Sequence, residues 1–381
     1  MPGLCVSGNS QVIDKLCAGL MALILGLVAC TPAVAADAEA TAKPAKKTAA
    51  APKVAAAEAI VLRSDHATAH VLADLIKQYQ ASKLGKVELQ PFSTISGLDA
   101  VHSGTADLAG TARAAMPNRE EEQGTNFYPV AWYAMVPIVD ADNPVSNISL
   151  KQLHDLYLGR LTNWKDLGGA DAEIGIDGVA PPLDGVEYST RLLLFHYGDQ
   201  AVSVPRLYVN VDKLEEDIAL NAHGVGLSTL SNAAHNPKVK MLSVEGVRAS
   251  AQTIADGSYP LYGVMYVAAR DDGKQHDAVA KFVEYISGDS AKTILRKHDV
   301  VPYADAAALI DKQTEHTAFI DAHIRPLATS TETPVSAPNA TAQALQAIAP
   351  TSELTAEAKA RAERAKVEKE GAKTAAKDTG H

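Results

Sequence analysis

The residues that could carry redox or metal chemistry are few in this 381-residue chain. Its three cysteines are Cys5, Cys17 and Cys30, and none follows residue 30. Without cysteines, the body of the chain can form neither a disulfide framework nor a cysteine zinc site. The sequence therefore excludes both classes of site from residue 31 onward.

The remaining polar residues do not form a catalytic pattern. The sequence has no Ser-His-Asp order, no zinc ligands and no paired metal carboxylates. The histidines lack metal-binding spacing, and we interpret them as surface or packed side chains: His66, His70, His102, His154, His196 and His223. The sequence thus predicts a protein that is not an enzyme and that has no metal and no cofactor.

The chemistry that remains is the binding of a small anion. The formal net charge of −10 argues against a nucleic-acid partner, because nothing would neutralise a phosphate backbone along a strand. The net charge does not argue against the binding of one small anion, since binding in a cleft depends on the local dipoles there and not on the charge of the whole protein. Replacing the water around such an anion takes helix N-termini, hydroxyl groups and commonly one arginine. The loops that lead from strands into helices are therefore the candidate binding elements.

The N-terminus has the pattern of an export signal. Lys15 precedes an apolar run at residues 18–29, which is too short to span a bilayer and has the length of a signal-peptide core. Two interpretations stay open. Residues 27–30 resemble a bacterial lipobox, in which Cys30 would be lipidated and anchor the protein to a membrane. Alternatively, cleavage follows the small residues at 33–35. Both predict export to the periplasm or cell envelope.

Composition divides the rest of the chain into a folded body and two polar extensions. The extensions are rich in Ala, Lys, Thr, Pro and Glu and lack apolar periodicity, which predicts disorder. The predicted organisation is a signal peptide at 1–30, a linker at 31–57, a substrate-binding domain at 58–327 and a tail at 328–381.

Within the body, strand and helix patterns alternate. Strands are predicted at 59–62, 87–89, 106–109, 128–139 and 261–268, and helices at 69–81, 97–102 and 278–296, with Ser149 as the N-cap of another helix. Repeated strand–helix units predict α/β architecture with mostly parallel sheets covered on both faces. Small ligands bind such sheets at the carboxyl ends of the strands.

Four segments in consistent order resemble the periplasmic phosphate-binding proteins of ABC importers. The most specific is 148–169, ISLKQLHDLYLGRLTNWKDLGG, in which a capped helix, a Gly turn and Thr-Asn-Trp precede Leu-Gly-Gly. HGVGLSTL at 223–230 and YPLYGVMY at 259–266 agree, as does VVPY at 300–303. The resemblance spans about residues 60–303.

The resemblance implies a type II periplasmic binding protein fold, two α/β lobes with mixed, mostly parallel sheets joined by hinge strands. Lobe I would comprise about 58–135 and 262–327, and lobe II about 136–261. It also implies four ligand-binding loops. The first, at 63–68, offers Ser64 and Asp65, with His66 or Thr68 as alternative donors. The second offers Thr94 at a helix N-terminus and the retained Gly97.

The other two implied loops depart from the family pattern. The third gives Asp107 as the expected proton-accepting carboxylate, with Arg113 after it. The fourth gives Ser189, Thr190 and Arg191, which match family positions. Two neighbours do not match: Asp184 stands where relatives have an Arg, and Tyr188 where they have a Ser. Either Arg63, Arg113 or Arg191 supplies the missing charge, or the ligand is not phosphate.

The resemblance implies reversible capture of phosphate or a similar small oxyanion between the lobes of a monomer, with ABC importer membrane subunits as partners. An alternative is an envelope protein that has lost phosphate binding and acts as a structural or interaction protein. A secreted phosphatase is a third hypothesis, which the lack of catalytic patterns disfavours.

Overall fold

The structure, a computed structural model, describes residues 59–180 and 184–325. The predictions for the signal segment, Cys30, the linker and the tail lie outside these residues. In the described part, no helix combines the length and the apolar character needed to cross a membrane.

The first lobe begins with strands that alternate with helices, as the sequence predicted. Its β1, β2 and β3 pair in parallel, with β1 in the middle. Helix α1 buries the side chains Val71, Leu72, Leu75 and Ile76, which recur at helical spacing, against this sheet. Its elements are β1 (Ile60–Asp65), α1 (His66–Ala81), β2 (Val87–Phe92), α2 (Thr94–His102), β3 (Leu108–Thr111), β11 (Tyr262–Arg270), α8 (His276–Ser287), α9 (Asp289–Lys297) and β12 (Val301–Pro302).

The second lobe repeats this arrangement around β6 and β8, which pair in parallel. Ser149 caps α3 in a capping box with Gln152, as predicted, and the buried Trp164 donates a hydrogen bond from its indole nitrogen to the carbonyl of His223. The elements are β5 (Asn147–Ile148), α3 (Leu150–Tyr157), β6 (Gly175–Val179), α4 (Gly185–Phe195), β7 (Arg206–Tyr208), α5 (Val211–Ile218), β8 (Gly224–Thr229), α6 (Leu230–Ala233), β9 (Val239–Met241), β10 (Ser243–Val244) and α7 (Ala251–Ala255).

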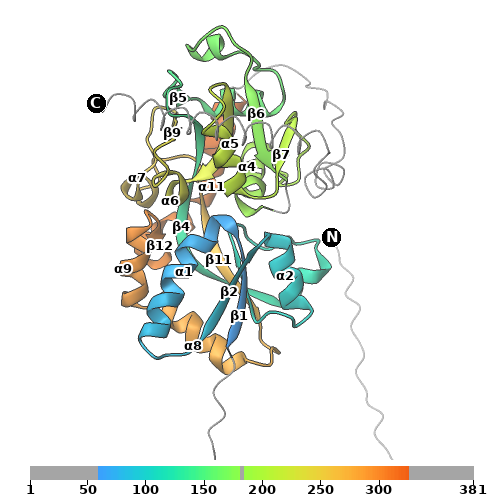
Figure 1. Cartoon of the computed structure of the whole chain (residues 1–381), viewed down its shortest axis with the longest axis vertical. Helices are drawn as coiled ribbons and strands as arrows, with labels where there is room; N and C mark the ends of the chain where they lie inside the picture. Colours follow the sequence, from blue (N-terminus) through green and yellow to red (C-terminus); the bar gives the residue numbers. More distant parts are fainter. Residues whose placement is uncertain (1–58, 181–183, 326–381) are drawn as a thin grey trace, which may run out of the picture. The chain divides into compact units, whose positions relative to one another are not determined.

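The long strand β4 (Thr125–Asp140) joins the two lobes. Its first part pairs antiparallel with β11, and its last part, from Met135, pairs antiparallel with β8. Its buried residues form a continuous apolar run from Val130 to Val139, because helices and strands cover both of its faces. Figure 1 shows β4 and β11 running between the lobes, in agreement with the hinge strands implied by the resemblance.

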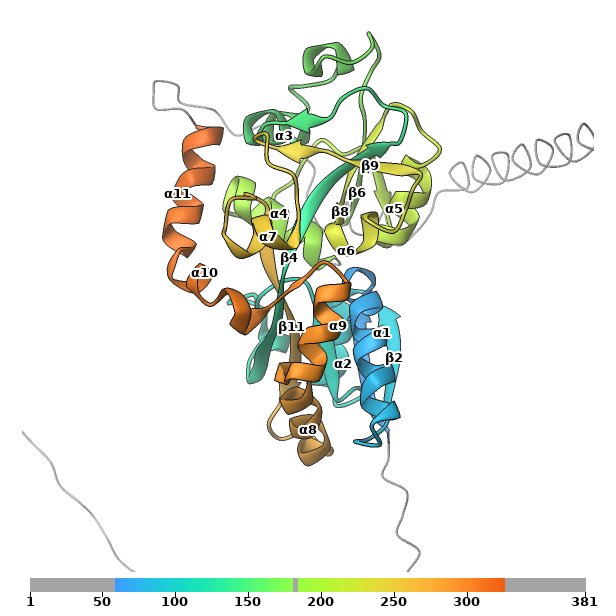
Figure 2. The same ribbon diagram turned by 90° about the vertical axis from the view of Figure 1, so that its left-hand side faces the viewer.

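The C-terminal helices differ from the prediction. Helix α11 (Gln313–Ile324) packs against α3 and α4 of the second lobe, whereas the sequence placed residues up to 327 in the first. The buried His316 fixes it with a hydrogen bond of 2.6 Å to the carbonyl of Pro260. Figure 2 shows α11 following α10 (Ala308–Asp311) along the side of the second lobe. The chain therefore returns to the second lobe after completing the first.

Candidate functional site

A buried carboxylate lies where three loops of the first lobe meet. Asp65 ends β1, caps α1 and is 1% exposed. Its Oδ1 accepts hydrogen bonds from the backbone N–H (2.9 Å) and hydroxyl (2.7 Å) of Thr68. Its Oδ2 accepts bonds from the hydroxyl of Thr94 (2.8 Å) and the N–H of Ala112 (3.0 Å). One side chain thus gathers the donors at the ends of β1 and β3 and at the start of α2.

Two further predicted residues belong to this group. The side chain of Ser64 is fully buried, and its hydroxyl has no hydrogen-bond partner among the described residues. Gly97 lets α2 approach β1 closely, because a methyl group at this position would lie 3.0 Å from the carbonyl oxygen of Arg63. Ser64 is therefore a buried hydroxyl that has no partner among the described residues, and the contribution of Gly97 is packing.

The N-terminus of α4 meets this group from the second lobe. A methyl group at Gly185 would lie 2.9 Å from the backbone N of Ala112 and 3.0 Å from Oδ2 of Asp65. The hydroxyl of Ser189 donates to the carbonyl of Ala112 (2.9 Å), which also accepts the hydroxyl of Tyr133 (2.6 Å). The two lobes are therefore in direct contact at Asp65 and Ala112. We call Ser64, Asp65, Thr94, Ala112 and the start of α4 the interlobe site.

A second buried carboxylate caps α4 at the same place. Oδ1 of Asp184 accepts the N–H groups of Val186 and Glu187, both at 2.9 Å. Burial, with the nearby charge of Asp65, raises the pKa of Asp184 to about 7. The family's cationic position thus holds a carboxyl group that retains its proton to near-neutral pH.

Two other contacts join the lobes around the interlobe site. His66, at the start of α1, contacts the carboxylate of Asp212 at the start of α5 at 2.8 Å. The guanidinium of Arg113 lies over the ring of Tyr188, 5.2 Å from its centroid. Tyr188, which replaces the expected serine, therefore contributes an interlobe contact.

The arginines considered for the missing charge are engaged elsewhere. Arg113 is buried and pairs with both carboxylate oxygens of Glu122, at 3.0 and 2.5 Å. Arg191 is buried inside the second lobe, where its Nε contacts Glu187 at 3.3 Å. Arg63 donates to the side chain of Gln90 at 2.9 Å. None of these cations is directed at Asp65.

Two predicted residues lie apart from the interlobe site. The hydroxyl of Thr190 donates to the carbonyl of Val186 in its own helix (2.9 Å). Asp107 precedes β3, and its carboxylate accepts the N–H of Val61 at 2.8 Å. Because β3 runs from residue 108 to 111, Asp107 lies at the opposite end of that strand from Ala112, roughly 15 Å away at strand geometry. The structure therefore places Asp107 away from the donors that Asp65 accepts, and which of the two carboxylates meets a ligand stays a prediction.

Sequence reasoning missed the role of three groups. The N–H of Ala112 carries no side-chain signal, and Tyr133 lies within an apolar strand pattern. Glu122 lies in the short 3-10 segment Glu120–Glu122, where three successive acidic residues resemble a solvated surface. The available signal for Glu122 was Arg113: a guanidinium that becomes buried needs a carboxylate partner, and Glu122 is a nearby carboxylate in the sequence.

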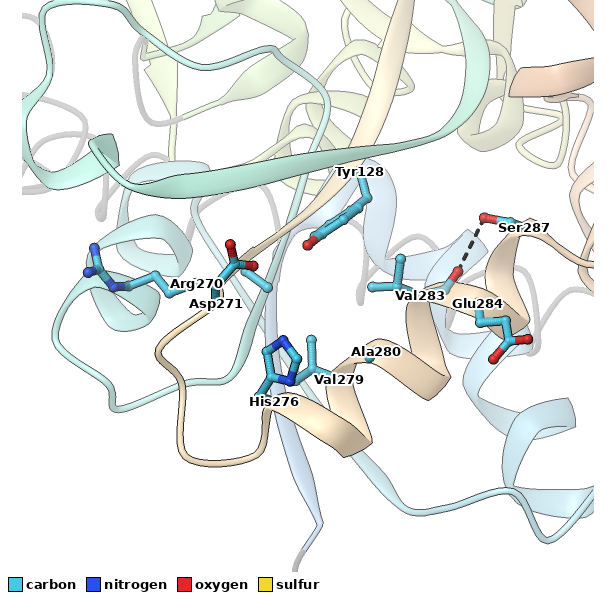
Figure 3. A pocket seen from close by; sticks show the side chains of 10 residues that line it. Tyr128, Arg270, Asp271, His276, Val279, Ala280, Val283, Glu284 and Ser287 are labelled. Atoms are coloured by element: carbon cyan, nitrogen blue, oxygen red, sulfur yellow. Dashed lines mark hydrogen bonds between the residues drawn. The ribbon is translucent and has the colours of Figure 1, made fainter.

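A separate hollow of about 260 Å³ lies on the first lobe between the end of β11 and α8. Figure 3 shows Tyr128 and His276 on opposite sides of it, with Ala280 and Val283 along α8 as further lining residues. Arg270 at its rim is bonded to Asp272. The hollow shares no residue with the interlobe site. Within residues 59–180 and 184–325, no three His, Cys, Asp or Glu residues are arranged to hold a metal ion.

Comparisons with known proteins agree with this architecture. A profile described as a PBP superfamily domain matches residues 38–177. The phosphate-binding protein PstS of Bacillus subtilis is 26% identical over 243 residues, which cover 62% of this chain and 77% of that protein. PstS 2 of Streptococcus agalactiae is 30% identical over 81 residues, 21% of this chain and 27% of that protein.

Two solved structures share the fold. A Clostridium perfringens structure with bound phosphate, assigned to the substrate-binding proteins of phosphate ABC transporters, aligns with a TM-score of 0.59 and 18% identity, over 64% of this chain and 99% of that one. An ABC-type phosphate transport receptor from Vibrio cholerae aligns with a TM-score of 0.52 and 22% identity, over 64% and 99%. These alignments confirm the predicted type II periplasmic binding protein fold.

Proposed function

Because the chain belongs to the PstS-like substrate-binding proteins of the PBP superfamily, we propose that it captures phosphate or a similar small oxyanion between its lobes. On this proposal it acts outside the cytoplasm and delivers the solute to the membrane subunits of an ABC importer. Export is proposed from the apolar segment at 18–29, with Cys30 as the candidate lipid anchor.

The observation that carries the proposal is the convergence of donors on one buried point between the lobes. The hydroxyl of Thr94 and the N–H of Ala112 both donate to Oδ2 of Asp65. The hydroxyl of Ser64, the residue before Asp65 in β1, is buried and has no partner among the described residues. When the lobes separate, Gly185 and Ser189 of α4 leave Ala112, and an entering oxyanion would draw the N–H of Ala112 and the hydroxyl of Thr94 away from Asp65. The N-terminus of α4 would then close over the anion with its dipole favourably oriented.

The carboxylates restrict which form of the oxyanion fits. Asp65 in its ionised form repels a fully ionised anion but accepts a hydrogen bond from a protonated one, such as the P–OH group of dihydrogen phosphate. The proposed ligand is therefore the protonated form of phosphate. Sulfate, which has no proton at neutral pH, should bind much more weakly.

Thermal unfolding of the full chain tests the proposal. At a phosphate concentration about a hundredfold above Kd, binding should stabilise the folded state by about 2.7 kcal/mol and raise Tm by roughly 5 to 10 °C near pH 6. Sulfate at equal ionic strength is the control and should leave Tm nearly unchanged. Equal shifts with both salts, or none with phosphate, would contradict phosphate capture.

A further inference from the structure

Two buried carboxyl groups meet where the lobes touch. Asp65 is 1% exposed and Asp184 4% exposed, and each caps the helix that follows it. The backbone of Gly185 lies against Oδ2 of Asp65, so the N-termini of α1 and α4 face one another across the interlobe site. The charge of Asp65 bears directly on Asp184.

The other titratable groups around this pair do not neutralise it. Glu187 on α4 adds a third buried carboxyl group. It accepts a hydrogen bond from the hydroxyl of Tyr157 (3.1 Å) and pairs with the Nε of Arg191. Tyr133 on β4 is fully buried, and burial raises its pKa well above the usual range, so it stays neutral.

The nearby cations are bound by other carboxylates. On α1, His66 contacts Asp212, and beyond β3, Arg113 contacts Glu122. The interlobe site therefore has two carboxyl groups and no cation of its own among these residues. Burial, together with the charge of Asp65, raises the pKa of Asp184 to about 7, so the carboxyl group of Asp184 holds a proton up to near-neutral pH.

We propose that this proton takes the place of the missing cation, so that the interlobe site captures an oxyanion together with one proton held by Asp184, next to the buried carboxylate of Asp65. The inference rests on the proposed oxyanion capture. A neutral carboxyl group donates an O–H···O bond to the anion and adds no negative charge to the site. When both groups are ionised, the anion faces two negative charges, and capture requires the uptake of a proton from solvent.

Calorimetric titration of the full chain with phosphate at several pH values between about 5.5 and 8.5 tests this coupling. Asp184, whose pKa is raised to about 7, is protonated below that pH and ionised above it. The affinity of the wild type should therefore fall roughly tenfold per pH unit above about 7, in addition to the change that phosphate's own ionisation causes.

Asp184→Asn is the matched comparison, because asparagine caps helices as well as aspartate does and its amide supplies a permanent neutral donor. Phosphate binding by this variant should depend less on pH, because binding takes up one proton fewer than in the wild type. Titrations in buffers of different ionisation enthalpy count the protons directly in the wild type. Asp107→Asn, at the far end of β3, should behave like the wild type.

The outcomes separate the two proposals. If phosphate binding near pH 8 takes up about one proton more in the wild type than in Asp184→Asn, the coupling of phosphate capture to proton uptake is supported. Phosphate binding with equal uptake in both proteins overturns the coupling and leaves phosphate capture standing. Phosphate binding by neither protein at any pH overturns both proposals.

Discussion

Replacing Glu122 by alanine should lower the free energy of unfolding by about 3–5 kcal/mol, because it leaves the guanidinium of Arg113 buried without its carboxylate. The side chains of Arg113 and Glu122 are 0% and 1% exposed and make two hydrogen bonds with one another. Glu122 also accepts the N–H of Met116 at 2.7 Å. Urea denaturation at pH 7 measures the loss.

Glu121→Ala is the control for this prediction. Glu121 is the preceding residue, but its side chain is 48% exposed and contacts only the edge of Arg119, at 3.6 Å. Its loss should cost less than about 1 kcal/mol. Arg113→Met combined with Glu122→Leu should recover much of the stability that Glu122→Ala loses, since the pair is replaced by apolar groups. Equal effects of Glu121→Ala and Glu122→Ala would contradict this account of the pair.

Gly185→Ala should weaken phosphate binding roughly ten- to hundredfold while leaving the second lobe folded. The added methyl group would meet backbone atoms of Ala112 at 2.9 and 3.0 Å, and backbone cannot move aside as a side chain can. Overpacking of this kind costs about 1–3 kcal/mol, and here it would destabilise the closed arrangement of the lobes. Within α4 itself alanine is the better helix former, so the helix should not lose stability.

Calorimetry of Gly185→Ala beside Gly175→Ala checks this result. Gly175 lies in β6 of the same lobe, and a methyl group there would lie 3.5 Å from the side-chain nitrogen of Asn221, an ordinary contact. Gly175→Ala should therefore keep the affinity of the wild type. Unchanged affinity in Gly185→Ala would mean that solute binding does not need α4 to close on Ala112.

The fold was predictable because its elements carry local signals. The helical spacing of Val71, Leu72 and Leu75 placed α1, and Ser149 marked the start of α3. The apolar run in β4 indicated a central strand. The position of α11 was not predictable, because this helix has no strong apolar stripe: its buried residues are His316, Ile320 and Ile324.

The site was harder to predict, since it depends on strand boundaries and on backbone groups. The sequence placed a strand at 106–109, whereas β3 covers Leu108–Thr111, and this shift moves Asp107 from the site to the far end of the strand. Asp65, an aspartate directly before a helix, had the N-cap signal that identifies it. Only the structure shows that Asp65 takes the donors from two other loops and that Asp184 lies beside it.

The most direct test of solute capture at the interlobe site is a calorimetric titration of the full chain with phosphate near pH 6, after unfolding and refolding to remove any bound ligand. Thr94→Val, which keeps the side-chain shape and removes the hydroxyl donor, is titrated in parallel. We predict saturable one-to-one binding to the wild type and an affinity at least about tenfold lower for the variant. Absence of binding heat in the wild type, or equal affinity in both proteins, would contradict capture at this site.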